Sequence, residues 1–192
     1  MSLISHKPFQ LTGRYAARNR WEVLIGPGDS RVTGRQIIID ENLQNAWSDK
    51  VILITGVSAR IGVETVRALA STGATIYGTA RNVAKAREAI GSTTISSGRI
   101  RLLHMDHTSL SSVRSCAAEF LSHCPNNKLH ILINNAAVMN TPHTITTDGH
   151  EVQFQTNHLA HFLLFSLLCP TLLASSTPAF HSRMVSLSSA GH

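Results

Sequence analysis

From residue 51 onwards, short apolar runs alternate with longer segments in which apolar residues recur every three or four positions. A short run rich in β-branched residues is typical of a buried strand, and the longer spacing is typical of an amphipathic helix. The runs predict strands at Val51–Thr55, Ala74–Thr79, Ile100–Met105, Leu129–Ile133 and Met184–Leu187. The segments between them predict helices at Ile61–Ser71 and Val83–Ile90, a helix capped by Ser109 that reaches about His123, and a helix from Asp148 to about Leu173.

This alternation predicts an α/β fold, a doubly wound Rossmann-type sheet whose parallel strands are covered by helices on both faces. Five strands connected in this way take the order 3-2-1-4-5. Residues 1–49 show little periodicity, apart from a short strand or helix at Gln36–Ile39. We therefore expect a lead segment at 1–49, packed on or trailing from the main domain, and a Rossmann-type domain at 50–192.

Composition then narrows the class of protein. The chain has 192 residues, of which 43% are hydrophobic and 15% charged, and this favours a packed globular domain over disorder. The formal net charge of +6 fits either a solvated basic surface or an anionic partner. The sequence has no Lys/Arg run, zinc-finger spacing or aromatic RNA-binding signature, so we expect no nucleic-acid partner. Three widely spaced cysteines without a CxxC pair are typical of reduced intracellular thiols.

The sequence does not predict a membrane span. The longest apolar run, Phe162–Leu173, is too short to cross a bilayer and is interrupted by Pro170. The first 21 residues contain basic but no acidic residues, a feature shared with organelle presequences. No amphipathic face or cleavage signal accompanies it, so a mobile basic tail and a cytoplasmic location are favoured, with an organelle left open.

The segment Val51–Gly62, VILITGVSARIG, predicts a buried strand that leads through a glycine loop into a helix. Gly56 and Gly62 allow backbone N–H groups to approach a pyrophosphate, and the start of the helix adds a partial positive charge. Because the loop also opens a strand–helix–strand unit, its context supports a dinucleotide site.

With the motifs that follow, the sequence from Val51 onwards resembles the short-chain dehydrogenase/reductase family. It is similar to the retinol-dehydrogenase-like branch and to the short-chain dehydrogenases of filamentous fungi. The motifs occur in the family's order: TGVSARIG, TAR ending at Arg81, HMDHTSLSSV, NNAA at Asn134–Ala137, DGHEVQFQTNHLAHFLL and RMVSLSSAGH.

The resemblance implies a site for NAD(H) or NADP(H). The residues expected to bind the coenzyme are Thr55, Gly56, Ser58, Arg60, Ile61, Gly62, Arg81, Asp106, His107, Asn135, Ala136 and Ala137. Arg81 ends the second strand, where an acid would bind the ribose 2′-hydroxyl and an arginine can bind a 2′-phosphate, so NADP(H) is favoured over NAD(H). Asp106 should lie beside the adenine, and His107 should stack on it or contact it.

Three positions depart from the family's pattern. His107 stands where relatives usually have an apolar residue, and Ala137 replaces a glycine, which is tolerable if its φ is negative. Arg60 also replaces a glycine, and a positive φ there costs about 1–2 kcal/mol. The Arg60 side chain could bind a coenzyme phosphate, fill the space that the coenzyme needs, or have no effect.

The resemblance also implies a catalytic set, of which only part is present. Ser189 matches the serine that holds the substrate oxygen, and Asn157 matches the helix asparagine that positions a water in the proton relay. The Tyr-x-x-x-Lys motif does not occur, since the two tyrosines, Tyr15 and Tyr77, are followed four residues later by Asn19 and Arg81. The histidine pairs 104/107 and 158/161 lack acidic or cysteine partners, so no metal site is predicted.

The missing motif suggests a chain shortened at its C-terminus, with the last part of the fold absent. The fifth strand would then be an open edge, and the long apolar helix would lose cover on one side. Two hypotheses remain: an NADP(H)-dependent oxidoreductase of a fungal metabolite pathway acting on a small carbonyl or alcohol substrate, or an inactive homologue that binds nucleotide or a full-length partner. A homo-oligomer is also open.

We predict that these 192 residues alone do not reduce ketones, because they lack the tyrosine that donates the proton and the lysine that lowers its pKa. The absorbance of NADPH, followed in the presence of ketones, measures any such reduction and should stay constant. Sustained turnover by the purified chain would contradict the prediction.

Overall fold

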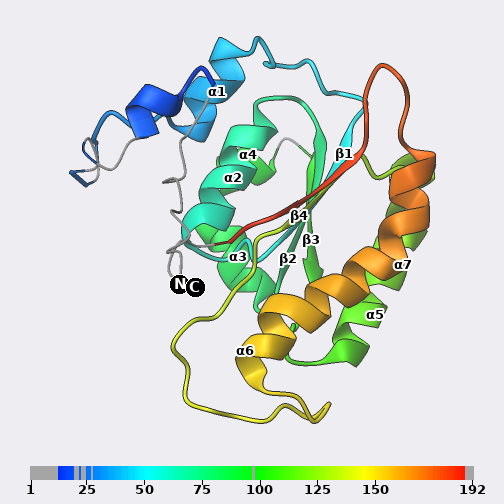
Figure 1. The fold of residues 1–192 in the computed structure, drawn as a ribbon. Coiled ribbons are helices and arrows are strands. Elements are labelled where there is room, and N and C mark those ends of the chain that lie inside the picture. Colours follow the sequence, from blue (N-terminus) through cyan, green and yellow to red (C-terminus); the bar gives the residue numbers. More distant parts are fainter. Residues whose placement is uncertain (1–12, 20–21, 23–24, 27, 97, 189–192) are drawn as a thin grey trace, which may run out of the picture.

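The computed structural model describes residues 13–19, 22, 25–26, 28–96 and 98–188. Its centre is a five-stranded parallel sheet with helices on both faces (Figure 1). The strand order is β3-β2-β1-β4-β5, which confirms the predicted topology. The strands are β1 (Val51–Thr55), β2 (Thr75–Ala80), β3 (Ile100–His104), β4 (Ile131–Asn134) and β5 (Arg183–Ser186).

The helices form two layers. One face of the sheet is covered by α2 and α3, and the other by α5 and α7 (Figure 1). The helical segments are η1 (Ala16–Asn19), α1 (Gly34–Asp40), α2 (Arg60–Ala70), α3 (Val83–Ile90), α4 (Ser92–Ile95), α5 (Leu110–His123), η3 (Pro125–Asn127), α6 (Val152–Phe154), the π-helical turn η4 (Gln155–Leu159) and α7 (Ala160–Ala174). Helix α1 of the lead segment packs on α2, where Gly34 lies close to Ala68.

Strand alternation explains why β1 is apolar throughout. Ile52 and Ile54 belong to the core beneath α2 and α3, whereas Val51 and Leu53 belong to the core beneath α5 and α7. Every residue of β1 is therefore buried. A central strand with helices on both faces needs apolar side chains on both sides, as the continuous run in the sequence indicated.

The predicted start of the long helix at Asp148 is wrong. Gly149 follows with a φ of +84°, which is outside the helical region, and the helical run begins at Val152 with Glu151 as its cap. The Asp148 carboxylate instead accepts hydrogen bonds from Leu110 N at 2.8 Å and from the Gln155 side chain at 2.7 Å. Asp148 thus connects two helices rather than opening one.

Pro170 does not interrupt α7, which continues to Ala174. By length and composition alone, the helical run Val152–Ala174 is long and apolar enough to cross a membrane, a criterion that a core helix also meets. In this structure α7 packs against β4 and α5 through Ala160, Leu164, Leu168 and Leu172. Only the side of α7 that faces the sheet therefore belongs to the hydrophobic core.

The other side of α7 and the edge strand β5 are open among the described residues. All four residues of β5 are exposed, and Phe162 and Leu173 of α7 are 62% and 69% exposed. The expectation of an open fifth strand and an uncovered long helix agrees with this arrangement.

Both tyrosines have structural contacts away from the carboxyl ends of the strands. The Tyr77 hydroxyl donates to the His123 carbonyl at 2.7 Å, and its ring packs edge-on against Phe120. The Tyr15 hydroxyl bonds Asp40 and Glu41 of the α1 region. Neither hydroxyl is placed to exchange a proton with a ligand at the rim of the sheet.

Candidate functional site

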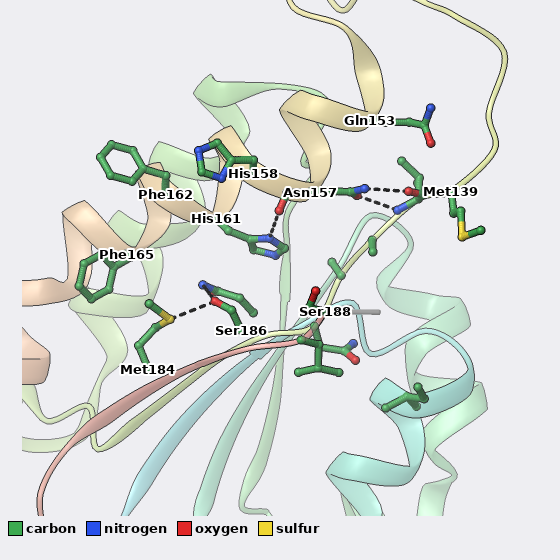
Figure 2. Close-up of a pocket in the computed structure, with 17 residues that line it drawn as sticks. Met139, Gln153, Asn157, His158, His161, Phe162, Phe165, Met184, Ser186 and Ser188 are labelled. Atoms are coloured by element: carbon green, nitrogen blue, oxygen red, sulfur yellow. Dashed lines mark hydrogen bonds between the residues drawn. The ribbon is translucent and has the colours of Figure 1, made fainter. Parts of the chain in front are cut away.

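Two cavities lie at the carboxyl ends of the strands, where ligands bind in open parallel sheets. The larger has a volume of about 730 Å³ and extends from the end of β4 to α7 and β5, as Figure 2 shows. The smaller, of about 250 Å³, lies between the ends of β1, β2 and β3. The segment Ala136–Val138, hereafter the wall, lines both cavities. One extended ligand could therefore cross the wall and occupy both.

The glycine loop is packed too tightly for any side chain at its two glycines. Gly56 has a φ of +73°, and a Cβ there would lie 2.8 Å from the Ala136 Cα. A Cβ at Gly62 would collide with the Gly56 carbonyl and lie 2.8 Å from the Asn135 amide nitrogen. The bare backbone therefore lies directly against the wall, as a pyrophosphate-binding loop requires.

Arg60 adopts the left-handed conformation, with a φ of +51°. Its side chain is exposed and lines neither cavity. The residue before α2, Ala59, provides no side-chain cap, so the first N–H groups of this helix have no side-chain acceptor from the cap position. Such free N–H groups can bind an anion.

The smaller cavity has a cationic end. Arg81 and Asn82 follow β2, and Lys85 lies in the first turn of α3; all three line the cavity. Sequence reasoning identified Arg81 but missed Lys85. The sequence contained a signal for Lys85, because it lies three residues after the helix cap Asn82. This spacing places it in the first turn of α3, beside the carboxyl end of β2.

Asp106 lies opposite these cations, after β3. Partial burial raises the pKa of its carboxyl, but hydrogen bonds from Thr108 and the charge of Arg81 outweigh this and lower the pKa below its usual value. Thr108 N and Oγ1 both donate to Asp106 Oδ1. Asp106 is therefore an ionised acceptor in the smaller cavity, which suits an exocyclic amino group.

Three buried polar atoms around the smaller cavity have no hydrogen-bond partner among the described residues. They are Thr79 Oγ1, His107 Nε2 and Thr156 Oγ1. Buried polar groups are seldom left unpaired, because each such group costs about 1–3 kcal/mol. Together with the glycine loop, these atoms fit a polar ligand such as a dinucleotide coenzyme.

The expected contact of His107 with the adenine stays a prediction, and His107 lines the smaller cavity where that contact would form. It is buried and packs edge-on against His161, with ring centroids 4.9 Å apart. Burial, and then the neighbouring His161, lower the pKa of His107 to about 3. The ring is therefore neutral near pH 7.

The wall is attached to the end of β1 and to the π-helical turn η4. Thr55 Oγ1 accepts from the backbone N–H groups of Asn135 and Ala136, each at 2.9 Å. The Asn157 side chain bonds both backbone groups of Val138, at 2.9 and 2.8 Å (Figure 2). Ala137 is not among the residues with positive φ, so its methyl group is tolerated.

The larger cavity is lined mainly by apolar side chains. Its polar members include Asn134, Asn157, Ser186 and Ser188 (Figure 2). Ser189, the predicted catalytic serine, lies outside the described residues, and its neighbour Ser188 lines the cavity. Ile61 of the glycine loop also reaches this cavity, whereas Ser58 lines the smaller one.

A family model for short chain dehydrogenases matches residues 50–190. Short-chain dehydrogenase/reductase prx1 of Penicillium roqueforti is 47% identical over 167 residues, which cover 87% of this chain and 48% of that protein. Retinol dehydrogenase 12 of Mus musculus is 43% identical over 145 residues, covering 74% of this chain and 44% of that protein. The chain thus spans about half the length of the curated relatives it matches.

Solved structures show the same fold. A metagenomic short-chain oxidoreductase in complex with NADP superposes with a TM-score of 0.63 at 23% identity, covering 77% of this chain and 65% of that one. At this identity the likeness supports the fold alone.

Replacing His107 with leucine should reduce the loss of stability at acidic pH. Between the ordinary pKa of 6.5 and about 3, the unfolded chain binds a proton at His107 that the folded chain does not. Stability therefore falls with decreasing pH in this window, by up to about 1.4 kcal/mol per unit. When the pH is lowered from 7.5 to 5.0, the free energy of unfolding measured with urea should decrease by about 1–2 kcal/mol less in His107→Leu than in the wild type. An equal decrease in the free energy of unfolding in the two proteins would contradict the lowered pKa of His107.

Replacing Arg60 with glycine should stabilise the fold by about 1 kcal/mol, because glycine adopts a left-handed conformation without strain. Urea unfolding measures the gain in stability. A variant less stable than the wild type would contradict the inference that Arg60 is strained. NADPH affinity of the same variant separates the three roles of the side chain: tighter binding indicates that Arg60 obstructs the coenzyme, weaker binding that it holds a phosphate, and equal binding that it does neither.

Proposed function

The chain belongs to the short-chain dehydrogenase family, and on that basis we propose that it forms the coenzyme-binding part of an oxidoreductase that transfers a hydride between NADP(H) and a carbonyl or alcohol substrate. The observation that carries this proposal is the continuous site at the sheet rim, in which Gly56 approaches Ala136 and the wall separates a polar cavity from a larger apolar one.

Each end of this site has a distinct task. The glycine loop and the first turn of α2 offer backbone N–H groups to the diphosphate. Asp106, which lines the smaller cavity, would accept from the adenine amino group. Asn135–Ala137, which line the larger cavity, would border the nicotinamide-side ribose, and the rest of that cavity would receive the nicotinamide and the substrate. When bound, the coenzyme supplies or accepts the hydride.

The preference for NADP(H) rests on two cations. Arg81 and Lys85 line the smaller cavity at the end of β2, where no acid is present to bind a ribose 2′-hydroxyl. Arginine and lysine both bind phosphate, and an arginine can do so through two parallel hydrogen bonds. A 2′-phosphate at this end would therefore be stabilised by two charges.

The proton transfer requires groups that these 192 residues do not contain. By resemblance, Ser189 would hold the substrate oxygen and Asn157 would position a water, but no Tyr-x-x-x-Lys motif occurs. The second candidate is therefore a homologue without catalytic activity that binds nucleotide or a full-length partner. The exposed apolar side chains Met184 and Val185 of β5 and Phe162 of α7 favour it. For either candidate, a role in a fungal metabolite pathway is proposed from the resemblance in sequence alone.

Fluorescence titration with NADPH and NADH tests the coenzyme site. We expect the chain to bind NADPH more tightly than NADH, because only NADPH has the phosphate that Arg81 can bind. The variant Arg81→Asp should weaken NADPH binding about tenfold or more, since a charge-assisted hydrogen bond contributes about 1.5–3 kcal/mol.

The control for this titration is Arg114→Asp, which makes the same change in net charge on the exposed side of α5, away from both cavities. It should leave the affinity for both coenzymes within about twofold of the wild type. If neither coenzyme binds to folded wild-type chain, the proposed function fails. If both bind equally, only the NADP(H) preference fails.

A further inference from the structure

His161 is a buried histidine whose two ring nitrogens contact two different parts of the site. It lies in the first turn of α7, and its ring points beneath Asn157 (Figure 2). The Nε2 atom lies 3.0 Å from Thr55 Oγ1, and the Nδ1 atom lies 3.2 Å from the Asn157 carbonyl oxygen. The ring therefore connects the end of β1 with the π-helical turn.

The Thr55 hydroxyl determines which of these nitrogens carries the proton. A hydroxyl oxygen has two lone pairs and one proton. Both lone pairs are used, because Thr55 Oγ1 accepts from the N–H groups of Asn135 and Ala136. The hydroxyl can then only donate to His161, so Nε2 must be an acceptor. The proton of the neutral ring lies on Nδ1 and is donated to the Asn157 carbonyl.

These contacts close a ring of hydrogen bonds around the wall. One path leads from Thr55 through Asn135 and Ala136 to Val138, whose backbone is held by the Asn157 side chain. The return path leads from the Asn157 carbonyl through His161 to Thr55. Since the members of such a network orient one another, the wall is fixed from both ends.

A protonated His161 does not fit this arrangement. A second proton, on Nε2, would point at the Thr55 oxygen, which would have to release one of its backbone donors. Burial lowers the pKa of His161; the hydrogen bond to the Asn157 carbonyl opposes this, the neighbouring His158 adds to it, and the net shift is downward. The His107 ring, which packs against it, is also neutral.

We propose that His161 is a positioning residue of the coenzyme site. In its Nδ1–H tautomer it fixes the Thr55 hydroxyl and the Asn157 carbonyl, and through them the wall that borders the nicotinamide-side ribose. The role toward the coenzyme rests on the proposed function. The tautomer does not, because it follows from contacts within the chain.

Nitrogen-15 NMR of histidine-labelled protein at neutral pH tests the tautomer. In the wild type, His161 Nδ1 should have the chemical shift of a protonated nitrogen and Nε2 that of an unprotonated one. Thr55→Ser keeps the hydroxyl and should keep this pattern, whereas Thr55→Val removes the hydroxyl and should lose it. A protonated Nε2 in the wild type overturns the proposal, whether or not a coenzyme binds.

NADPH titration tests the positioning role. His161→Gln should weaken binding about tenfold, because one amide group cannot make both contacts in the same geometry. The matched control is His123→Gln: its Nδ1 also lies near the carbonyl four residues earlier, at 2.9 Å from Glu119 O, but on the exposed side of α5. This control should bind NADPH like the wild type.

Three outcomes decide the matter. Equal affinity of His161→Gln and the wild type, with both folded by circular dichroism, overturns the positioning role. A wild type that does not bind NADPH refutes the proposed function and the positioning role with it, while the NMR result still decides the tautomer. If His161→Gln does not fold, the wild-type tautomer and the Thr55→Ser and Thr55→Val pair decide.

Discussion

The close approach of the glycine loop to the segment after β4 is the constraint on which the rest of the site depends. Gly56 lies against Ala136, and Gly62 lies between the Gly56 carbonyl and Asn135. These contacts exist only because β1 and β4 are neighbours in the sheet, with Ile52 opposite Ile131. The central position of β1, apolar on both faces, thus places bare backbone beside the wall.

The sequence predicted those features that depend on local pattern. The five strands, their order and the cap Ser109 follow from apolar periodicity and turn residues. The start of the long helix was wrong, because the side chain of Asp148 bonds a residue 38 positions away, which no local pattern indicates. The predicted end of the long helix near Leu173 agrees with the structure, in which α7 runs through Pro170 to Ala174.

The site was predicted less completely than the fold, for a physical reason. Motif residues such as Gly56, Arg81 and Asn157 could be identified from their order along the chain, and the spacing of Lys85 from Asn82 was a signal that was overlooked. The contacts of His161, by contrast, exist only in three dimensions. His107 was expected at the adenine; it lines the smaller cavity, and its edge-on contact with His161 could not be predicted from the sequence.

The wall and the glycine loop are joined by residues 80 and 81 positions apart in the sequence, through the Thr55 hydroxyl. Any partially folded form in which β4 has not paired with β1 therefore has no place for a dinucleotide, however well the first three strands are formed. A ligand that binds only the complete site stabilises that long-range pairing through mass action. Under the proposed function, occupancy of the rim by a coenzyme would thus report on the pairing of β1 with β4.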